Sequence, residues 1–123
     1  MLKPTRRDEV EELTSVDGSR IRELAHPRSS EAARQSLAEA TVPPGGETRE
    51  HLHREAEEIY SFIAGSGRMR LGDAEGPVGP GETVVIRPGT PHKLWNDGAE
   101  PLVLLCCCSP PYSDGDTVVL EDG

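Results

Sequence analysis

Apolar and polar residues alternate along short stretches of this chain, and turns rich in Gly and Pro separate the stretches. Successive side chains of a β-strand point to opposite faces, so this alternation predicts half-buried strands. Helical spacing is not sustained anywhere, apart from one turn expected within residues 30–36. The sequence therefore predicts an all-β fold of the sandwich or barrel kind. We expect strands at residues 21–24, 36–42, 51–53, 58–63, 68–71 and 102–108, two more within 81–96, and an edge strand or docking segment at 117–120.

Two histidines separated by one residue, His51 and His53, lie in one of these stretches, so both imidazoles point to the same side of a sheet. Residues 54–57 are too charged to bury and read as a turn, after which Glu58 opens a new strand. If the two strands pair, the carboxylate lies beside the imidazoles, which outlines a site for a first-row transition metal. A histidine pair alone is more often two solvated residues, so the spacing by itself leaves both interpretations open.

The surrounding positions resemble the two motifs of the cupin superfamily, and most closely a small single-domain cupin of bacterial type. The first motif is matched by Gly45, His51, His53, Glu58 and Gly65. The second motif is matched by Gly81, Gly89, His92 and Asn96, with Arg87 at a position where the pattern has proline.

The resemblance implies a double-stranded β-helix barrel of the jelly-roll type. It also implies one divalent transition metal (Fe, Mn, Ni, Cu or Zn) held by His51, His53, Glu58 and His92. The departure at Arg87 affects the local turn and leaves this ligand set intact. His26 matches no ligand position and is interpreted as a loop histidine.

The chain has 123 residues, a net charge of −9 and a pI near 4.8. This length predicts one domain, with residues 1–17 as an N-terminal arm and residues 18–123 as the barrel. Scattered Lys and Arg in an acidic chain argue against a nucleic-acid partner. No apolar run approaches the roughly 18 residues of a membrane span, and no signal peptide is evident. We therefore expect a cytoplasmic protein with no membrane partner.

Residues 102–108 form a continuous apolar run, which is typical of a strand buried on both faces. An apolar outer surface on so small a barrel would be covered by a second subunit, so we expect a homodimer. The run ends in Cys106, Cys107 and Cys108, which alternate in direction and lack zinc-site spacing. We interpret them as buried, reduced packing residues. The alternative places Cys106 or Cys108 inside the barrel near the metal.

Strand parity places Tyr60, Phe62 and Leu94 toward the interior as pocket lining. The stiff segment of residues 109–111 is expected to hold Tyr112 near a barrel end, so Tyr60 and Tyr112 are the candidate catalytic residues. A metal with open coordination positions can polarise a carbonyl or present oxygen to a substrate. The resemblance thus implies a metal-dependent enzyme acting on a small organic molecule, as an oxygenase (dioxygenase-like), an isomerase or a lyase. The alternatives are a small-molecule-binding protein without turnover and a metal-free sugar-binding or epimerase-like barrel.

Overall fold

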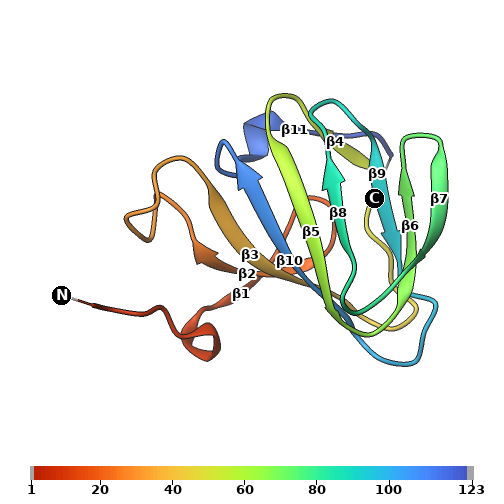
Figure 1. Ribbon diagram of the computed structural model, residues 1–123, viewed down its shortest axis with the longest axis horizontal. Helices are drawn as coiled ribbons and strands as arrows, with labels where there is room; N and C mark the ends of the chain where they lie inside the picture. The colour runs from red at the N-terminus through yellow and green to blue at the C-terminus, as the bar shows by residue number, and fades with distance from the viewer. Residues whose placement is uncertain (1, 122–123) are drawn as a thin grey trace.

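The computed structural model describes residues 2–121, which form two antiparallel sheets wrapped into a barrel (Figure 1). The six-stranded sheet has the order β1 (Glu12–Thr14), β2 (Arg20–Ala25), β3 (Ser36–Val42), β10 (Leu102–Ser109), β5 (Glu57–Ala64) and β8 (Thr83–Ile86). The five-stranded sheet has the order β11 (Thr117–Val119), β4 (His51–His53), β9 (His92–Trp95), β6 (Gly67–Leu71) and β7 (Ala74–Val78). Two 3-10 turns, η1 (Arg7–Glu9) and η2 (Asp114–Asp116), complete the described chain.

The all-β prediction and the double-stranded β-helix are confirmed. The strand expected at residues 36–42 agrees with β3 at both ends. The helical turn expected within residues 30–36 is wrong, because that stretch contains only bends. No helix within residues 2–121 is long and apolar enough to cross a membrane.

The hydrophobic core lies between the two sheets. Its most enclosed apolar side chains are 1% exposed or less: Val42, Phe62, Ile86, Leu102 and Leu104. Burying a side chain of this size stabilises the fold by about 1.5–3 kcal/mol. Because β3, β10 and β5 are central strands of one sheet, their alternate residues form a continuous inner wall.

Two glycines beside this core are required by close backbone approach. Gly65 has a φ of 75°, and a Cβ there would overlap the carbonyl of Pro101. A Cβ on Gly67 would overlap the carbonyl of Trp95. The end of the first motif is therefore fixed by sterics, since no larger residue fits between these strands.

The two strands that carry the first motif do not pair with each other, so the expected pairing is wrong. Strand β4 pairs with β9 and β11, and His51 lies opposite His92 in that register. Strand β5 belongs to the other sheet, where Glu58 lies opposite Ile86 and Cys108. The carboxylate therefore meets the imidazoles across the barrel interior, from the opposing sheet.

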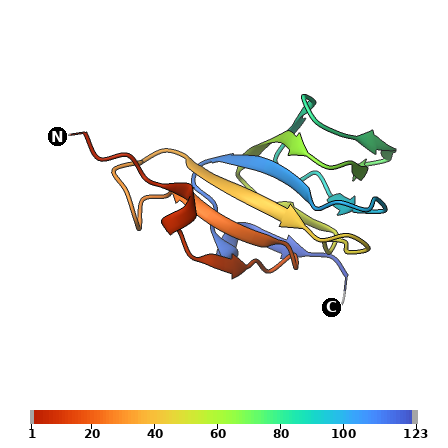
Figure 2. The same ribbon diagram turned by 90° about the horizontal axis from the view of Figure 1, so that it is seen from below.

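The N-terminal segment packs on the barrel along part of its length. Strand β1 pairs with β2 at the edge of the larger sheet, and the turn after it buries Asp17 (Figure 2). The division between an arm and a barrel at residue 18 stays a prediction. The residues just before that division contribute to the site described below.

Strand β10 turns one face inward and the other outward. Leu102, Leu104 and Cys108 are buried on the inner face, whereas Val103 and Leu105 on the outer face are partly exposed. The run is thus buried on one face within a single chain. The homodimer expected to cover the outer face stays a prediction, as does the cytoplasmic location.

Candidate metal centre

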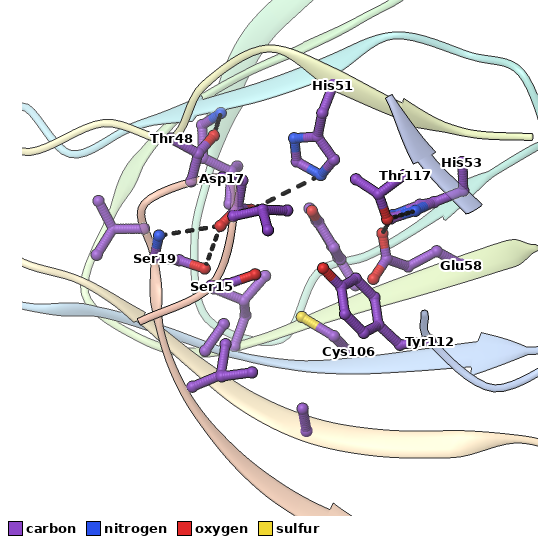
Figure 3. Close-up of a pocket in the computed structure, with 18 residues that line it drawn as sticks. Ser15, Asp17, Ser19, Thr48, His51, His53, Glu58, Cys106, Tyr112 and Thr117 are labelled. Carbon is purple, nitrogen blue, oxygen red and sulfur yellow. Dashed lines mark hydrogen bonds and ion pairs between the residues drawn. The ribbon is translucent and has the colours of Figure 1, made fainter. Parts of the chain in front are cut away.

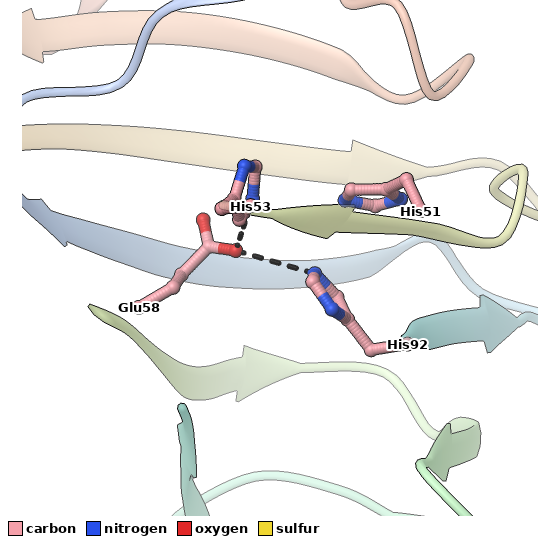
Figure 4. Close-up of side chains that lie close together, drawn as sticks. All are labelled: His51, His53, Glu58 and His92. Atoms are coloured by element: carbon pink, nitrogen blue, oxygen red, sulfur yellow. Dashed lines mark hydrogen bonds and ion pairs between the residues drawn. The ribbon is translucent and has the colours of Figure 1, made fainter. Parts of the chain in front are cut away.

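Four side chains that the sequence marks as ligands converge at one end of the barrel (Figure 4). His51 and His53 come from β4, His92 from the adjacent β9, and Glu58 from β5 in the opposing sheet. All four are buried, and one potential ligand atom from each lies within 4.8 Å of the others. The i, i+2 spacing on β4 aims both imidazoles inward, and the β4–β9 register adds the third.

The outer nitrogen of each imidazole is held by an acceptor, which fixes the tautomer. His51 Nδ1 donates to the carbonyl of Arg49 at 2.8 Å, and His92 Nδ1 donates to the carbonyl of Thr90 at 2.9 Å. A carbonyl can only accept, so both Nδ1 atoms carry the proton.

His53 Nδ1 lies 3.0 Å from Thr117 Oγ1, and that hydroxyl already donates its proton to the carbonyl of Ser113. The hydroxyl must therefore accept from His53. All three Nε2 atoms are left with lone pairs that face the centre, which is the arrangement that orients imidazoles for a metal.

The donor set at the centre fits a divalent ion. His53 Nε2 lies 3.0 Å and His92 Nε2 lies 3.4 Å from Glu58 Oε1. Ligands at about 2.1 Å from an ion and at right angles to each other stand about 3 Å apart. His92 Nε2 is buried without a hydrogen-bond partner, a costly state that coordination would relieve. The second oxygen of Glu58 accepts from Cys108 Sγ at 3.2 Å, which orients the carboxylate.

The electrostatics of the four groups follow from burial and mutual contact. Burial, followed by the nearby His92, lowers the pKa of His51. Burial also opposes protonation of His53, but the hydrogen bond and charge of Glu58 outweigh it and raise the pKa of His53. For Glu58 burial acts to raise the pKa, and the neighbouring His53 and His92 overcome it and lower the pKa to about 2. The carboxylate is thus ionised and ready to neutralise a cation.

A cavity lined by 18 residues, which include His51, His53 and Glu58, lies beside the centre (Figure 3). One wall is apolar and includes Leu94, Leu104 and Ile21. The remaining wall carries hydroxyl groups and one carboxylate, from Ser15, Asp17, Ser19, Thr48, Tyr112 and Thr117. The centre therefore faces open space on the side that carries the polar groups.

Of the residues that parity assigns to the pocket lining, Tyr60 and Leu94 line this cavity. Phe62 lies deeper, in the hydrophobic core, because β5 runs away from the centre and places Phe62 against Leu104. Phe62 is not among the residues that line the cavity.

The two candidate catalytic tyrosines both reach the cavity. Burial raises the pKa of Tyr60 well above its usual value, so this phenol stays protonated. Tyr112 packs its ring edge-on against His53 with the centroids 5.9 Å apart, and its hydroxyl donates to Asp114. Burial also raises the pKa of Tyr112, to about 12.

The cysteines differ in their surroundings. Cys106 lines the cavity and Cys108 contacts Glu58, as the alternative interpretation places them, while Cys107 faces outward near Gln35. Burial raises the pKa of both Cys106 and Cys108, which keeps these thiols protonated.

His26 lies outside the ligand set, in the loop where the sequence places it. Its Nε2 lies 2.8 Å from the carbonyl of Tyr112, so it anchors the C-terminal segment to the loop after β2. Arg68 and Arg70 pair with Glu75 and Glu50 outside the cavity.

Sequence reasoning missed Asp17 entirely. Its Oδ2 lies 3.6 Å from His51 Nε2, and its Oδ1 accepts from the backbone N–H and the hydroxyl of Ser19. An Asp-Gly-Ser turn ahead of a strand is a common surface pattern. No local signal therefore distinguished this carboxylate from the other acidic residues of the N-terminal segment.

The chain is similar to known proteins both in a family domain and over nearly its whole length. Residues 38–108 match the cupin domain family. An uncharacterized protein, MJ1618, from Methanocaldococcus jannaschii is 47% identical over 117 residues, which are 95% of this chain and 94% of that protein. All four metal-site residues lie in the matched family region, whereas Asp17 and Tyr112 lie outside it.

Two solved structures are similar to the whole chain or most of it. The polyketide cyclase RemF from Streptomyces resistomycificus has a TM-score of 0.83 and 26% identity, and the match covers 100% of this chain and 88% of that one. A predicted oxalate decarboxylase from Thermotoga maritima has a TM-score of 0.76 and 21% identity, covering 88% of this chain and 99% of that one. At 21% identity the second likeness shows the fold alone.

Proposed function

The chain belongs to the cupin family, and from its buried centre we propose that it is a metal-dependent enzyme that rearranges a small carbonyl compound, as an isomerase or lyase does. The observation that carries the proposal is the set of three inward Nε2 lone pairs and one carboxylate beside a cavity. Sites that serve only structure close their coordination sphere with protein ligands. Here the four ligands converge from two opposing sheets, and a cavity adjoins them.

His51, His53, Glu58 and His92 would hold the ion, and its chemistry in such a site is to polarise a carbonyl oxygen as a Lewis acid. Three neutral imidazoles and one carboxylate leave a divalent ion with a net charge near +1. That charge would stabilise the negative oxygen that develops when a proton leaves the neighbouring carbon.

The other cavity residues would supply hydrogen-bonding groups in a site that excludes water. Tyr60 and Tyr112 keep their phenolic protons because burial raises the pKa of both groups. Tyr60 would donate a hydrogen bond to a bound oxygen rather than act as a base, whereas the Tyr112 hydroxyl already donates to Asp114. The apolar wall removes water from the remainder of the ligand, which strengthens every polar contact in the cavity.

The similarity to a polyketide cyclase over the full chain favours carbonyl rearrangement over the oxygenase option. A second function, binding of a small molecule without turnover, uses the same metal and the same cavity. Only a rate measurement separates the two.

The first test is metal content in protein purified without added ions. We expect about one divalent ion per chain in the wild type and in Glu57→Gln, an exposed carboxylate next to the ligand, and far less in Glu58→Gln. Equal metal content in the two variants would remove Glu58 from the centre.

The second test follows exchange of carbon-bound protons for deuterium in hydroxyacetone by NMR. We expect the metal-loaded wild type to accelerate this exchange. With Glu58→Gln the exchange rate should equal the rate measured in buffer without protein. Metal at one per chain with no acceleration, for hydroxyacetone and for a set of larger hydroxyketones, would make the binding protein the better assignment.

A further inference from the structure

Asp17 supplies a second buried carboxylate on the side of the cavity opposite Glu58. It is 8% exposed and lies in the turn between β1 and β2, with Oδ2 directed at His51 Nε2 (Figure 3). Both donors that hold this side chain, the backbone N–H of Ser19 at 2.9 Å and the Ser19 hydroxyl at 2.7 Å, bind Oδ1. Oδ2 is therefore left as the acceptor that faces the cavity.

The turn that carries Asp17 is held firmly against the barrel. Arg49 N–H donates to the carbonyl of Asp17 at 2.7 Å, and Ser15 and Ser19 bond through their backbones across the turn. Because Arg49 lies two residues before His51, the first residue of β4, the carboxylate is fixed relative to the histidines of that strand. A rigid acceptor can discriminate between ligands that differ by one hydrogen-bond donor.

The charges around the cavity determine how the Asp17 carboxylate affects a charged ligand. Two carboxylates, Asp17 and Glu58, are among the 18 lining residues, and no lysine or arginine is. Lys93, which is also buried, pairs instead with Glu47 and Glu121 outside the cavity. A divalent ion and the two carboxylates sum to zero charge. An anionic ligand would therefore enter a neutral cavity that offers no lysine or arginine as a counter-ion, and would meet the Asp17 carboxylate at short range.

We propose, on the basis of the proposed metal-dependent function, that Asp17 is a specificity-determining residue that selects neutral hydroxy-carbonyl ligands and excludes carboxylates and phosphates. Oδ2 accepts a hydrogen bond from a ligand hydroxyl while the carbonyl oxygen of the same ligand approaches the metal centre. The hydroxyl-lined wall beside it suits a neutral polar ligand and supplies no positive charge for an anion. The substrate class is thus a small α-hydroxyketone or phenolic ketone.

The test compares two probes on cobalt(II)-loaded protein, oxalate as the anion and hydroxyacetone as the neutral ligand, followed by the visible spectrum of the ion. In Asp17→Asn we expect oxalate affinity to rise at least tenfold, because a unit negative charge close to the ligand is removed. Hydroxyacetone affinity should fall several-fold, since an amide is a weaker acceptor than a carboxylate.

Glu47→Gln is the matched control, because it removes the same charge from outside the cavity. We expect less than a twofold change in oxalate affinity for this control. Asp17→Ser provides a second variant that keeps an acceptor for the turn without the charge, and circular dichroism reports whether each variant folds.

Three outcomes separate the possibilities. Unchanged oxalate affinity in both Asp17 variants, with cobalt bound at one per chain, would overturn the selectivity. Loss of cobalt in Asp17→Asn to the level of Glu58→Gln would also overturn it and make Asp17 a metal ligand. Failure of the wild type itself to bind cobalt would instead overturn the proposed function on which the selectivity rests.

Discussion

The two halves of the cavity come from different parts of the chain and carry different kinds of residue. The ligand half is built from β4, β5 and β9, all within the region matched to the cupin family, and it holds three histidines and Glu58. The entrance half is built from the turn before β2, the segment before β11 and β11 itself, which contribute Asp17, Tyr112 and Thr117 respectively. In our proposal, the first half holds the metal ion and the second selects the ligand that reaches it.

This difference explains how one barrel can serve unrelated functions. The ligands occupy strands whose direction is fixed by the hydrogen-bonded sheets, so they tolerate little change. The entrance residues occupy turns and chain ends, which can vary without disturbing the core. Relatives that share the ligand half therefore need not share a substrate.

The largest expected effect comes from breaking the ligand half alone. His53→Ala and His92→Ala should reduce bound metal from about one ion per chain to near zero, because each removes a first-row metal ligand. Tyr112→Phe, in the entrance half, should keep full metal content. Elemental analysis of the three variants checks this contrast, and full occupancy in both histidine variants would refute the metal site.

A smaller effect is expected at the contact that joins the halves. Thr117→Val removes the acceptor for His53 Nδ1, and the loss of such an outer partner typically lowers metal affinity about 10–100-fold. Thr83→Val, which changes an exposed threonine on β8, should leave affinity within about twofold of the wild type. Competition with a chelator of known affinity measures both, and equal affinities would show that Thr117 does not orient the ligand.

Protons and the metal ion should compete for His53 in the ligand half, so metal affinity should depend on pH. The pKa of His53 is raised above its usual 6.5 by Glu58, so the metal-free protein holds a proton there that metal must displace. Metal affinity should therefore be constant well above this pKa and fall by up to about tenfold per pH unit below it. Equilibrium dialysis between pH 5 and 9 measures the slope, and a flat profile would contradict proton displacement at His53.

The smallest effect concerns the thiols. Burial raises the pKa of Cys106 and Cys108, whereas Cys107 lies on the outer face of β10. A thiol-titrating reagent should therefore modify about one cysteine per native chain and three after denaturation. Cys107→Ser should show none in the native state. Prompt modification of two or more thiols in the native wild type would place Cys106 or Cys108 in contact with solvent.

The sequence alone determined the strands of the first half and its four candidate ligands. Alternation of apolar and polar residues is local, so it located β3 at both ends and identified every strand that carries a ligand. The spacing of His51, His53, Glu58 and His92 is likewise local within each motif. Their convergence in the structure is the outcome that the resemblance implied.

Only the tertiary structure decided which strands pair and what completes the cavity. Whether Glu58 lies beside the histidines on one sheet or across from them on the other depends on pairings between residues far apart in sequence. Strand parity likewise predicted that Phe62 points into the barrel, but it did not predict how far from the metal centre Phe62 lies. In the structure Phe62 lies in the hydrophobic core and does not line the cavity. Asp17 reaches His51 because the β1–β2 turn folds back over the barrel end, a contact across 34 positions that no pattern of neighbouring residues encodes.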